Sequence, residues 1–180
     1  MPIPIIGNAF IGIAIPEHIT NLITDLYDND LKTIKYVKPS NLHITLKFLG
    51  KSDERKIILI KEALNYIRFP HFDIILNKAV FWNPNIVALE VELNPYLNAV
   101  KHELDKIIFR HALIDIDKKP FKPHITVART KAKFNKIELN NLLTTYKTIN
   151  NKKFQSNQIH LYRSLRIKGK QNDYIKLFTV

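Results

Sequence analysis

The alternation of apolar and polar positions along the chain predicts strands and helices in mixed order. Positions with a period of two predict strands over residues 9–15, 42–49, 72–80, 86–93, 125–129, 154–167 and 174–179. Apolar residues at helical spacing predict helices that begin near residue 17 and others over 52–67, 95–108 and 137–146. Several strands are hairpin-like neighbours. We therefore expect an α/β protein of the α+β type, with mainly antiparallel sheets and helices on the outside.

Local signals mark the starts of two helices and two turns. Ser52 is a candidate N-cap for the second helix, and Asn94 followed by Pro95 is a candidate cap for the third. Turn-forming residues at 83–85 and 168–170 predict tight connections between strands. These signals set the expected boundaries of the elements around them.

The composition narrows the class of protein. A chain of 180 residues with 46% apolar residues can bury a core as one domain or as two small lobes. It has no cysteine, which excludes disulfides, Cys-based zinc sites and thiol catalysis. No apolar run approaches the roughly 18 residues of a membrane span, and the apolar start over 1–16 predicts a strand rather than a signal peptide. We expect a cytoplasmic monomer with no membrane association.

The positive charge is concentrated near the C-terminus. Residues 131–180 carry 11 Lys and Arg against 2 Asp and Glu, whereas residues 1–130 carry 17 against 14. Such a surface would attract a polyanion such as RNA. The same excess also fits a solvated, lysine-rich surface, so charge alone leaves both interpretations open.

The tripeptide His-Ile-Thr occurs three times, beginning at His18, His43 and His124. The first copy opens a helical pattern, which predicts a surface position without a catalytic role. The other two each follow a loop that contains Lys-Pro and enter a predicted strand. Residues two apart on a strand share a face, so His43 lies beside Thr45, and His124 beside Thr126.

Strict alternation makes further predictions about these two strands. It places Phe48 in the core and Lys47 on the face of His43, where a solvated lysine is favoured over one that assists catalysis. It also places Arg129 on the face opposite His124, unless a bulge or a strand end intervenes.

Two imidazoles and two hydroxyls suit phosphoryl chemistry. With pKa values of about 6.5, one imidazole can act as a base and the other as an acid near neutral pH. Hydroxyls and nearby cations can hold a phosphoryl group between them. The carboxylates that bind magnesium are not visible beside the motifs, and zinc held by the two histidines would lack an evident third ligand. We expect no metal and no other cofactor.

The two motifs resemble those of the two-histidine (2H) phosphoesterases, specifically the RNA 2′,3′-cyclic phosphodiesterases once described as 2′-5′ RNA ligases. The resemblance spans nearly the whole chain and is most specific over 36–50 and 123–129. It implies a single domain over 1–180, in which two pseudo-symmetric lobes flank a central cleft that carries both motifs.

The resemblance also implies a reaction and roles for the site residues. The substrate would be RNA that ends in a 2′,3′-cyclic phosphate, opened by water to a 2′-phosphate. His43 would be the proton donor and His124 the proton acceptor, while Thr45, Thr126 and Arg129 would bind the substrate phosphate. A weak reverse ligation to a 2′-5′ bond is a further implied activity.

Several alternatives stay open at this stage, because the motifs identify the phosphate and not the group attached to it. Within the superfamily, the substrate could be a cyclic nucleotide, an ADP-ribose cyclic phosphate or an RNA end that is trimmed exonucleolytically. A module that binds RNA ends without turnover is a candidate from another class, although paired histidines argue against it. Tyr36 is equally suited to stacking on a base and to packing.

Overall fold

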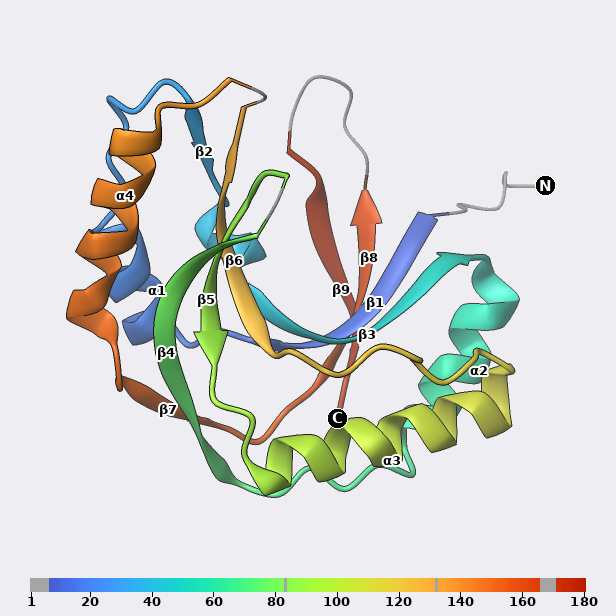
Figure 1. The fold of residues 1–180 in the computed structure, drawn as a ribbon. Coiled ribbons are helices and arrows are strands. Elements are labelled where there is room, and N and C mark those ends of the chain that lie inside the picture. The colour runs from blue at the N-terminus through green and yellow to red at the C-terminus, as the bar shows by residue number, and fades with distance from the viewer. Residues whose placement is uncertain (1–6, 83, 132, 166–170) are drawn as a thin grey trace.

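The computed structural model describes residues 7–82, 84–131, 133–165 and 171–180 (Figure 1). Its helices are α1 (Glu17–Thr24), α2 (Glu54–Leu64), α3 (Pro95–Ala112) and α4 (Lys136–Thr145), with 3₁₀ turns η1 (Pro39–Asn41) and η2 (Tyr146–Ile149). Its strands are β1 (Gly7–Ala14), β2 (Ile34–Tyr36), β3 (His43–Ser52), β4 (Phe72–Trp82), β5 (Ile86–Val91), β6 (His124–Thr130), β7 (Lys153–Ser156), β8 (His160–Leu165) and β9 (Asp173–Thr179).

The strands form a curled nine-stranded sheet in the order β7-β4-β5-β6-β3-β1-β8-β9, with β2 paired to β6. All of these pairings are antiparallel, as expected from the hairpin-like order of the strands. Helices α2 and α3 pack together and contact β3, whereas α4 contacts β4 and lies beside α1 on the other side of the molecule (Figure 1). The mixed α/β fold with outer helices is therefore confirmed.

The two His-Ile-Thr strands meet at the centre of the sheet. Strands β3 and β6 are joined through the pair Ile44–Ile125, the middle residue of each motif. On its other side β3 pairs with β1, and β6 pairs with β5. The motifs therefore run antiparallel beside each other, at the junction of two halves that have the same local arrangement.

Each of these strands contains a β-bulge just after its His-x-Thr motif. The pairing of β3 with β1 skips Leu46, and the pairing of β6 with β5 skips Val127. An inserted residue reverses the alternation of faces beyond it. As a result, Leu46 and Lys47 are both buried, and so are Val127 and Ala128.

The bulges correct two predictions and settle a third. Phe48, expected in the core, is 59% exposed, while Lys47, expected on the solvent side with His43, is only 1% exposed. In β6 the bulge returns Arg129 to the side of the sheet that carries His124, where both residues line one pocket. Strict alternation failed at these three positions because side-chain polarity does not reveal where a bulge will form.

The helix caps agree with the sequence in one case and differ in the other. Helix α3 begins at the predicted cap, where the Asn94 side chain accepts a hydrogen bond from the Leu97 N–H at 2.8 Å. Helix α2 is instead capped by Asp53, which accepts from the Lys56 N–H at 2.8 Å. Ser52 was the wrong choice because it is buried as the last residue of β3.

The C-terminal strands also differ from their predicted extent. In its described part, the strand predicted over 154–167 is two strands, because β7 pairs with β4 whereas β8 crosses over to pair with β1. Residues 166–167 of this prediction lie outside the described residues. Residue 83 of the turn predicted at 83–85 lies outside the described part of the chain. The turn predicted at 168–170 and the segment 1–6 lie wholly outside it. Among the described residues, no helix is long and apolar enough to cross a membrane.

Candidate active site

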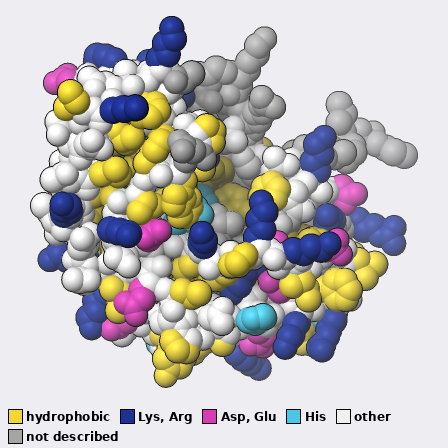
Figure 2. Space-filling model, in the orientation of Figure 1, with side chains coloured by type: hydrophobic (Ala, Val, Ile, Leu, Met, Phe, Trp, Pro, Cys, Tyr) yellow, Lys and Arg dark blue, Asp and Glu magenta, His cyan; other side chains and the backbone are white. Residues whose placement is uncertain are grey.

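A pocket of about 310 Å³ lies where β3 and β6 meet, and both histidine motifs open into it. Its lining includes all five residues singled out in the sequence: His43, Thr45, His124, Thr126 and Arg129. Figure 2 shows a hollow in the middle of this face, with a histidine side chain in it and Lys or Arg side chains around it. The fold therefore brings together two segments that lie far apart in the sequence.

The two histidine rings are held in the same way. His43 Nδ1 lies 2.7 Å from the carbonyl oxygen of Asn41, and His124 Nδ1 lies 2.8 Å from that of Lys122. A carbonyl oxygen can only accept a hydrogen bond, so the neutral form of each ring carries its proton on Nδ1. Each Nε2 is then left with a lone pair, on the side of the ring away from these carbonyls.

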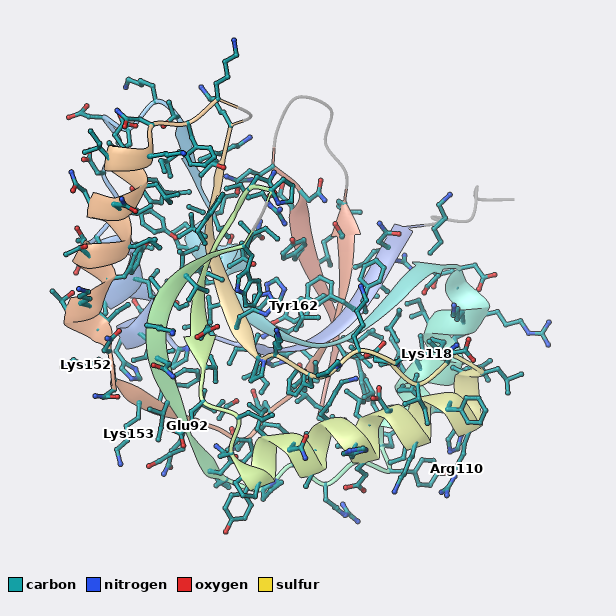
Figure 3. The ribbon with its side chains drawn as sticks, in the orientation of Figure 1. Glu92, Arg110, Lys118, Lys152, Lys153 and Tyr162 are labelled. Carbon is teal, nitrogen blue, oxygen red and sulfur yellow. The ribbon has the colours of Figure 1, made fainter. Side chains whose placement is uncertain are left out.

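His43 lies in an aromatic enclosure. Its ring centroid is 4.6 Å from that of Phe10 and 5.2 Å from that of Tyr174, which meets it edge-on. Phe10 in turn stacks on Tyr162, which points into the middle of the molecule (Figure 3). The neutral Nε2 accepts a hydrogen bond from the Thr45 hydroxyl at 3.0 Å.

This enclosure lowers the pKa of His43 below its ordinary value. Burial is the main cause, and the charge of His124 adds to it, while the hydrogen bond to the Asn41 carbonyl acts in the opposite direction. Near neutral pH, His43 in the free protein is therefore a neutral imidazole. An anion bound beside it would raise its pKa again.

His124 has a different neighbour on its open side. The Trp82 ring meets it edge-on, with centroids 4.6 Å apart, from the end of β4. The backbone carbonyl that orients His124 belongs to the loop over 113–123, which joins α3 to β6. This histidine thus sits between a strand end and a loop rather than inside an aromatic cluster.

The charge in the pocket suits an anion. Arg129 supplies a guanidinium, and its charge acts on the nearby Tyr174 by lowering a pKa that burial raises. The described residues that line the pocket include no Asp or Glu. A guanidinium, two hydroxyls and two imidazoles are the groups that hold a phosphoryl oxygen and move protons around it.

The aromatic residues around the two histidines were missed in the sequence, namely Phe10, Phe48, Trp82 and Tyr174. Phe48 lines the pocket because of the bulge in β3, which no pattern of residue types revealed. Trp82 could have been noticed, because it is the single tryptophan and precedes the predicted turn at 83–85. For Trp82 the indication would have come from the rarity of tryptophan in the sequence and not from the spacing of apolar residues.

Two further residues considered in the sequence, His18 and Tyr36, lie outside the pocket. His18 is exposed in the first turn of α1, as predicted for the copy of the motif that was set aside. Tyr36 stacks on Tyr27 with ring centroids 4.2 Å apart, and its hydroxyl accepts from the Asp28 N–H, which gives it a packing role. Within the described residues, no group of three or more His, Cys, Asp or Glu is arranged to hold a metal ion.

Comparison with known proteins gives a consistent result. Residues 13–88 match the model of the family described as LigT like Phosphoesterase. An RNA 2′,3′-cyclic phosphodiesterase of Methanocaldococcus jannaschii is 33% identical over 171 residues, which cover 86% of this chain and 90% of that protein. A second one, from Bacillus subtilis, is 34% identical over 128 residues, which cover 67% of this chain and 69% of the relative.

Solved structures show the same fold. Escherichia coli LigT complexed with phosphate superposes with a TM-score of 0.73 at 22% identity, covering 97% of this chain and 96% of that one. The complex of the same protein with 3′-AMP gives a TM-score of 0.74. The extent and identity of the sequence matches establish that this chain belongs to the LigT-like phosphoesterases of the two-histidine superfamily.

Proposed function

We propose that the protein hydrolyses the 2′,3′-cyclic phosphate at the end of RNA and leaves a 2′-phosphate. The observation that carries this proposal is the pairing of β3 with β6, which brings two similarly oriented imidazoles, two threonines and one arginine to a single pocket. The relatives named RNA 2′,3′-cyclic phosphodiesterase support this choice of substrate. The two halves of the sheet act as one domain, because each supplies half of the site.

In the proposed reaction, water attacks phosphorus opposite the departing O3′. His124 Nε2 accepts a proton from the water as the new P–O bond forms. The P–O3′ bond breaks, and His43 Nε2 gives its proton to O3′. Both roles require a ring whose Nε2 faces the substrate, which is the orientation that the Asn41 and Lys122 carbonyls impose.

The remaining groups stabilise the phosphate. In the complex the protonated His43 no longer accepts from Thr45, so the hydroxyls of Thr45 and Thr126 donate to the non-bridging oxygens. The Arg129 guanidinium adds charge-assisted hydrogen bonds. Negative charge grows on these oxygens in the transition state, so such donors accelerate the reaction as well as bind the substrate. Acid, base and charge stabilisation all come from side chains, and we propose that no metal ion takes part.

The donor role of His43 requires a protonated ring in the complex. Burial lowers the pKa of His43 in the free protein, so the proton must be stabilised by the substrate. The anionic phosphate supplies that stabilisation when it binds beside the ring. His43 is then charged only while substrate is present, and O3′ receives its proton from a group that returns to neutral at the end of the cycle.

One observation favours the opposite direction of proton transfer. A histidine with a lowered pKa is well suited to be a base, because it is neutral at the working pH. In that case His43 would activate the water and His124 would protonate the leaving oxygen. The substrate would then have to turn in the pocket so that its leaving oxygen faces His124 and the water lies beside His43.

Assignment of the product tests the proposal. Purified protein treated with EDTA is incubated with a short RNA that ends in a 2′,3′-cyclic phosphate, and the position of the phosphate is determined by NMR. We expect a 2′-phosphate, with turnover unaffected by EDTA. A 3′-phosphate would show that O2′ departs in place of O3′ and would reject the proposed product, and absence of turnover would favour an RNA-end-binding module or another cyclic phosphate.

A further inference from the structure

A second cavity, of about 500 Å³, adjoins the histidine pocket. The two cavities share three lining residues, Thr45, Phe48 and His124. The rest of the second cavity is formed mainly by Trp82 and by the loop over 113–123. A chain attached to a phosphate in the first pocket can therefore continue directly into the second.

The second cavity combines aromatic rings with positive charge. Its lining includes three aromatic residues and three exposed lysines: Phe48, Trp82, Phe121, Lys118, Lys119 and Lys122. Bases stack on aromatic side chains irrespective of sequence, while lysines attract the phosphates between them. This combination is typical of grooves that bind single-stranded nucleic acid.

An ion cluster with three buried members, Lys47, Lys101 and Asp105, ties down the loop that carries these lysines. The loop has no regular secondary structure, yet Asp117 accepts from Lys101 Nζ at 2.6 Å, and the Asp115 carbonyl accepts from Lys47 Nζ at 2.6 Å. Below them, Asp105 pairs with Lys101 at 2.7 Å and with Lys47 at 2.9 Å. Because the loop is tied down just before Lys118, its backbone is positioned before a ligand binds, which favours affinity.

We propose that this second cavity is the subsite for the penultimate nucleotide of a single-stranded RNA substrate. The proposal rests on the proposed function, since it places the terminal cyclic phosphate in the histidine pocket. It follows that the protein selects an RNA chain over a mononucleoside 2′,3′-cyclic phosphate. It also follows that the RNA runs along the loop over 113–123, and not along the basic C-terminal fifty residues.

A pair of charge-matched variants tests the subsite. The loop variant changes Lys118 and Lys119 to Gln, and the control variant changes Lys147 and Lys152 to Gln, which are all exposed. Figure 3 shows Lys118 and Lys152 on opposite sides of the molecule. Both variants lose two positive charges, so any difference between them reports position and not net charge.

The substrates are a hexanucleotide RNA with a terminal 2′,3′-cyclic phosphate and the corresponding mononucleoside cyclic phosphate. For the loop variant, we expect KM for the hexanucleotide to rise about tenfold or more with kcat preserved. The effect should be confined to the hexanucleotide, because the proposal places the mononucleoside in the histidine pocket and only the longer chain in the second cavity. The control variant should behave like the original protein with both substrates.

Salt and base dependence separate the two contributions to this subsite. Each lysine that pairs with a phosphate of a single strand contributes about 0.7 to the slope of log KM against log salt, and the loop variant should lose that contribution. A hexanucleotide without the penultimate base should bind about five- to a hundredfold more weakly, because stacking is lost while the phosphates stay.

Three results would overturn the subsite. Equal effects of the loop and control variants would show only long-range attraction. An equal rise in KM for the mononucleoside would place the lysines at the terminal phosphate. If neither substrate turns over, the proposed function fails, and fluorescence anisotropy with a labelled hexanucleotide ending in a 2′-phosphate still tests the subsite. Equal affinity of the loop and control variants in that assay would reject it.

Discussion

Strands β3 and β6 have the same local arrangement of backbone and motif residues, but the side chains around the two motifs differ. Each presents a histidine and a threonine, each orients its histidine through the carbonyl two residues earlier, and each has a bulge at the residue after threonine. The bulge brings one more side chain into the pocket. In β3 that side chain is Phe48, and in β6 it is Arg129.

The difference separates an apolar half of the site from a charged half. His43 is enclosed by aromatic rings, and burial lowers its pKa. His124 shares its strand with the guanidinium of Arg129 and is held by a loop that is rich in lysine. A repeated backbone arrangement therefore positions a histidine and a threonine twice, whereas the residues after the bulge give each half its own electrostatic environment.

The largest expected effects concern the two histidines. His43→Ala and His124→Ala should each lower kcat by about 10²–10⁴, since each removes one proton-transfer group. The double variant should lose far less than the product of the two, because acid and base act as a unit. His18→Ala, at the third His-Ile-Thr copy, is the matched control and should leave kcat unchanged. Full activity in either single variant would contradict the two-histidine mechanism.

The bulge in β3 buries a charged residue, Lys47, whereas the bulge in β6 buries the apolar Ala128, so only the β3 half needs a buried counter-charge. Lys47 pairs with the buried Asp105, so Asp105→Ala leaves Lys47 and Lys101 with only the partly exposed Asp117 as a carboxylate partner. The free energy of unfolding should fall by about 3–5 kcal/mol, measured by urea denaturation. Asp73→Ala, which removes an ion pair at the surface, should have little effect. If Asp105→Ala lowered the free energy of unfolding as little as Asp73→Ala is expected to, the buried cluster would not be a determinant of stability.

The residues exposed by the bulges, Phe48 and Arg129, give a third comparison. Arg129→Ala should lower kcat/KM by about 10²–10³, because a donor to the developing charge is lost. Arg129→Lys should recover only part of this, since lysine lacks the guanidinium fork. Phe48→Ala should act mainly on KM. If Phe48→Ala lowered kcat as much as Arg129→Ala, the proposed division between the two halves would be wrong.

The smallest effect is a pH dependence of stability that belongs to the β3 half. Burial lowers the pKa of His43, and burial together with Lys176 lowers that of His160 to about 4. The unfolded chain takes up protons near pH 6.5, before the folded protein does, so stability is lost as the pH falls from there toward 4.

Urea denaturation at pH 7.5 and pH 5 measures this loss. His160→Gln should reduce the difference in unfolding free energy between the two pH values, and His43→Gln should do so independently. The buried position of His160, with Nδ1 2.8 Å from the Thr179 hydroxyl, makes a fall in overall stability expected as well. The informative quantity is therefore the difference between pH values, and an unchanged difference in both variants would contradict the assignment.

The sequence predicted the parts of the site that depend on local periodicity. A period of two is enough to place His43 beside Thr45 and His124 beside Thr126, and all four line the pocket. The bulges were not predictable, because they depend on how β3 fits β1 and how β6 fits β5. Phe48 and Lys47 were misplaced for that reason.

Long-range partners set the second limit of prediction. Lys47 looked like a surface lysine, since its counter-charges Asp105 and Asp117 come from a helix and a loop far along the chain. The same holds for the strand predicted over 154–167, which divides because its two ends pair with strands on different sides of the sheet. A local pattern of residue types describes one helix or strand at a time, whereas an ion pair or a strand pairing depends on two elements that are far apart in the sequence.

The most direct test of the account replaces the leaving oxygen. A short RNA that ends in a 2′,3′-cyclic phosphate with sulfur in place of O3′ has a leaving group that departs without a proton. If His43 is the donor, this substrate should restore most of the activity lost in His43→Ala and little of that lost in His124→Ala. Rescue of His124→Ala instead would reverse the assigned roles and contradict the central claim.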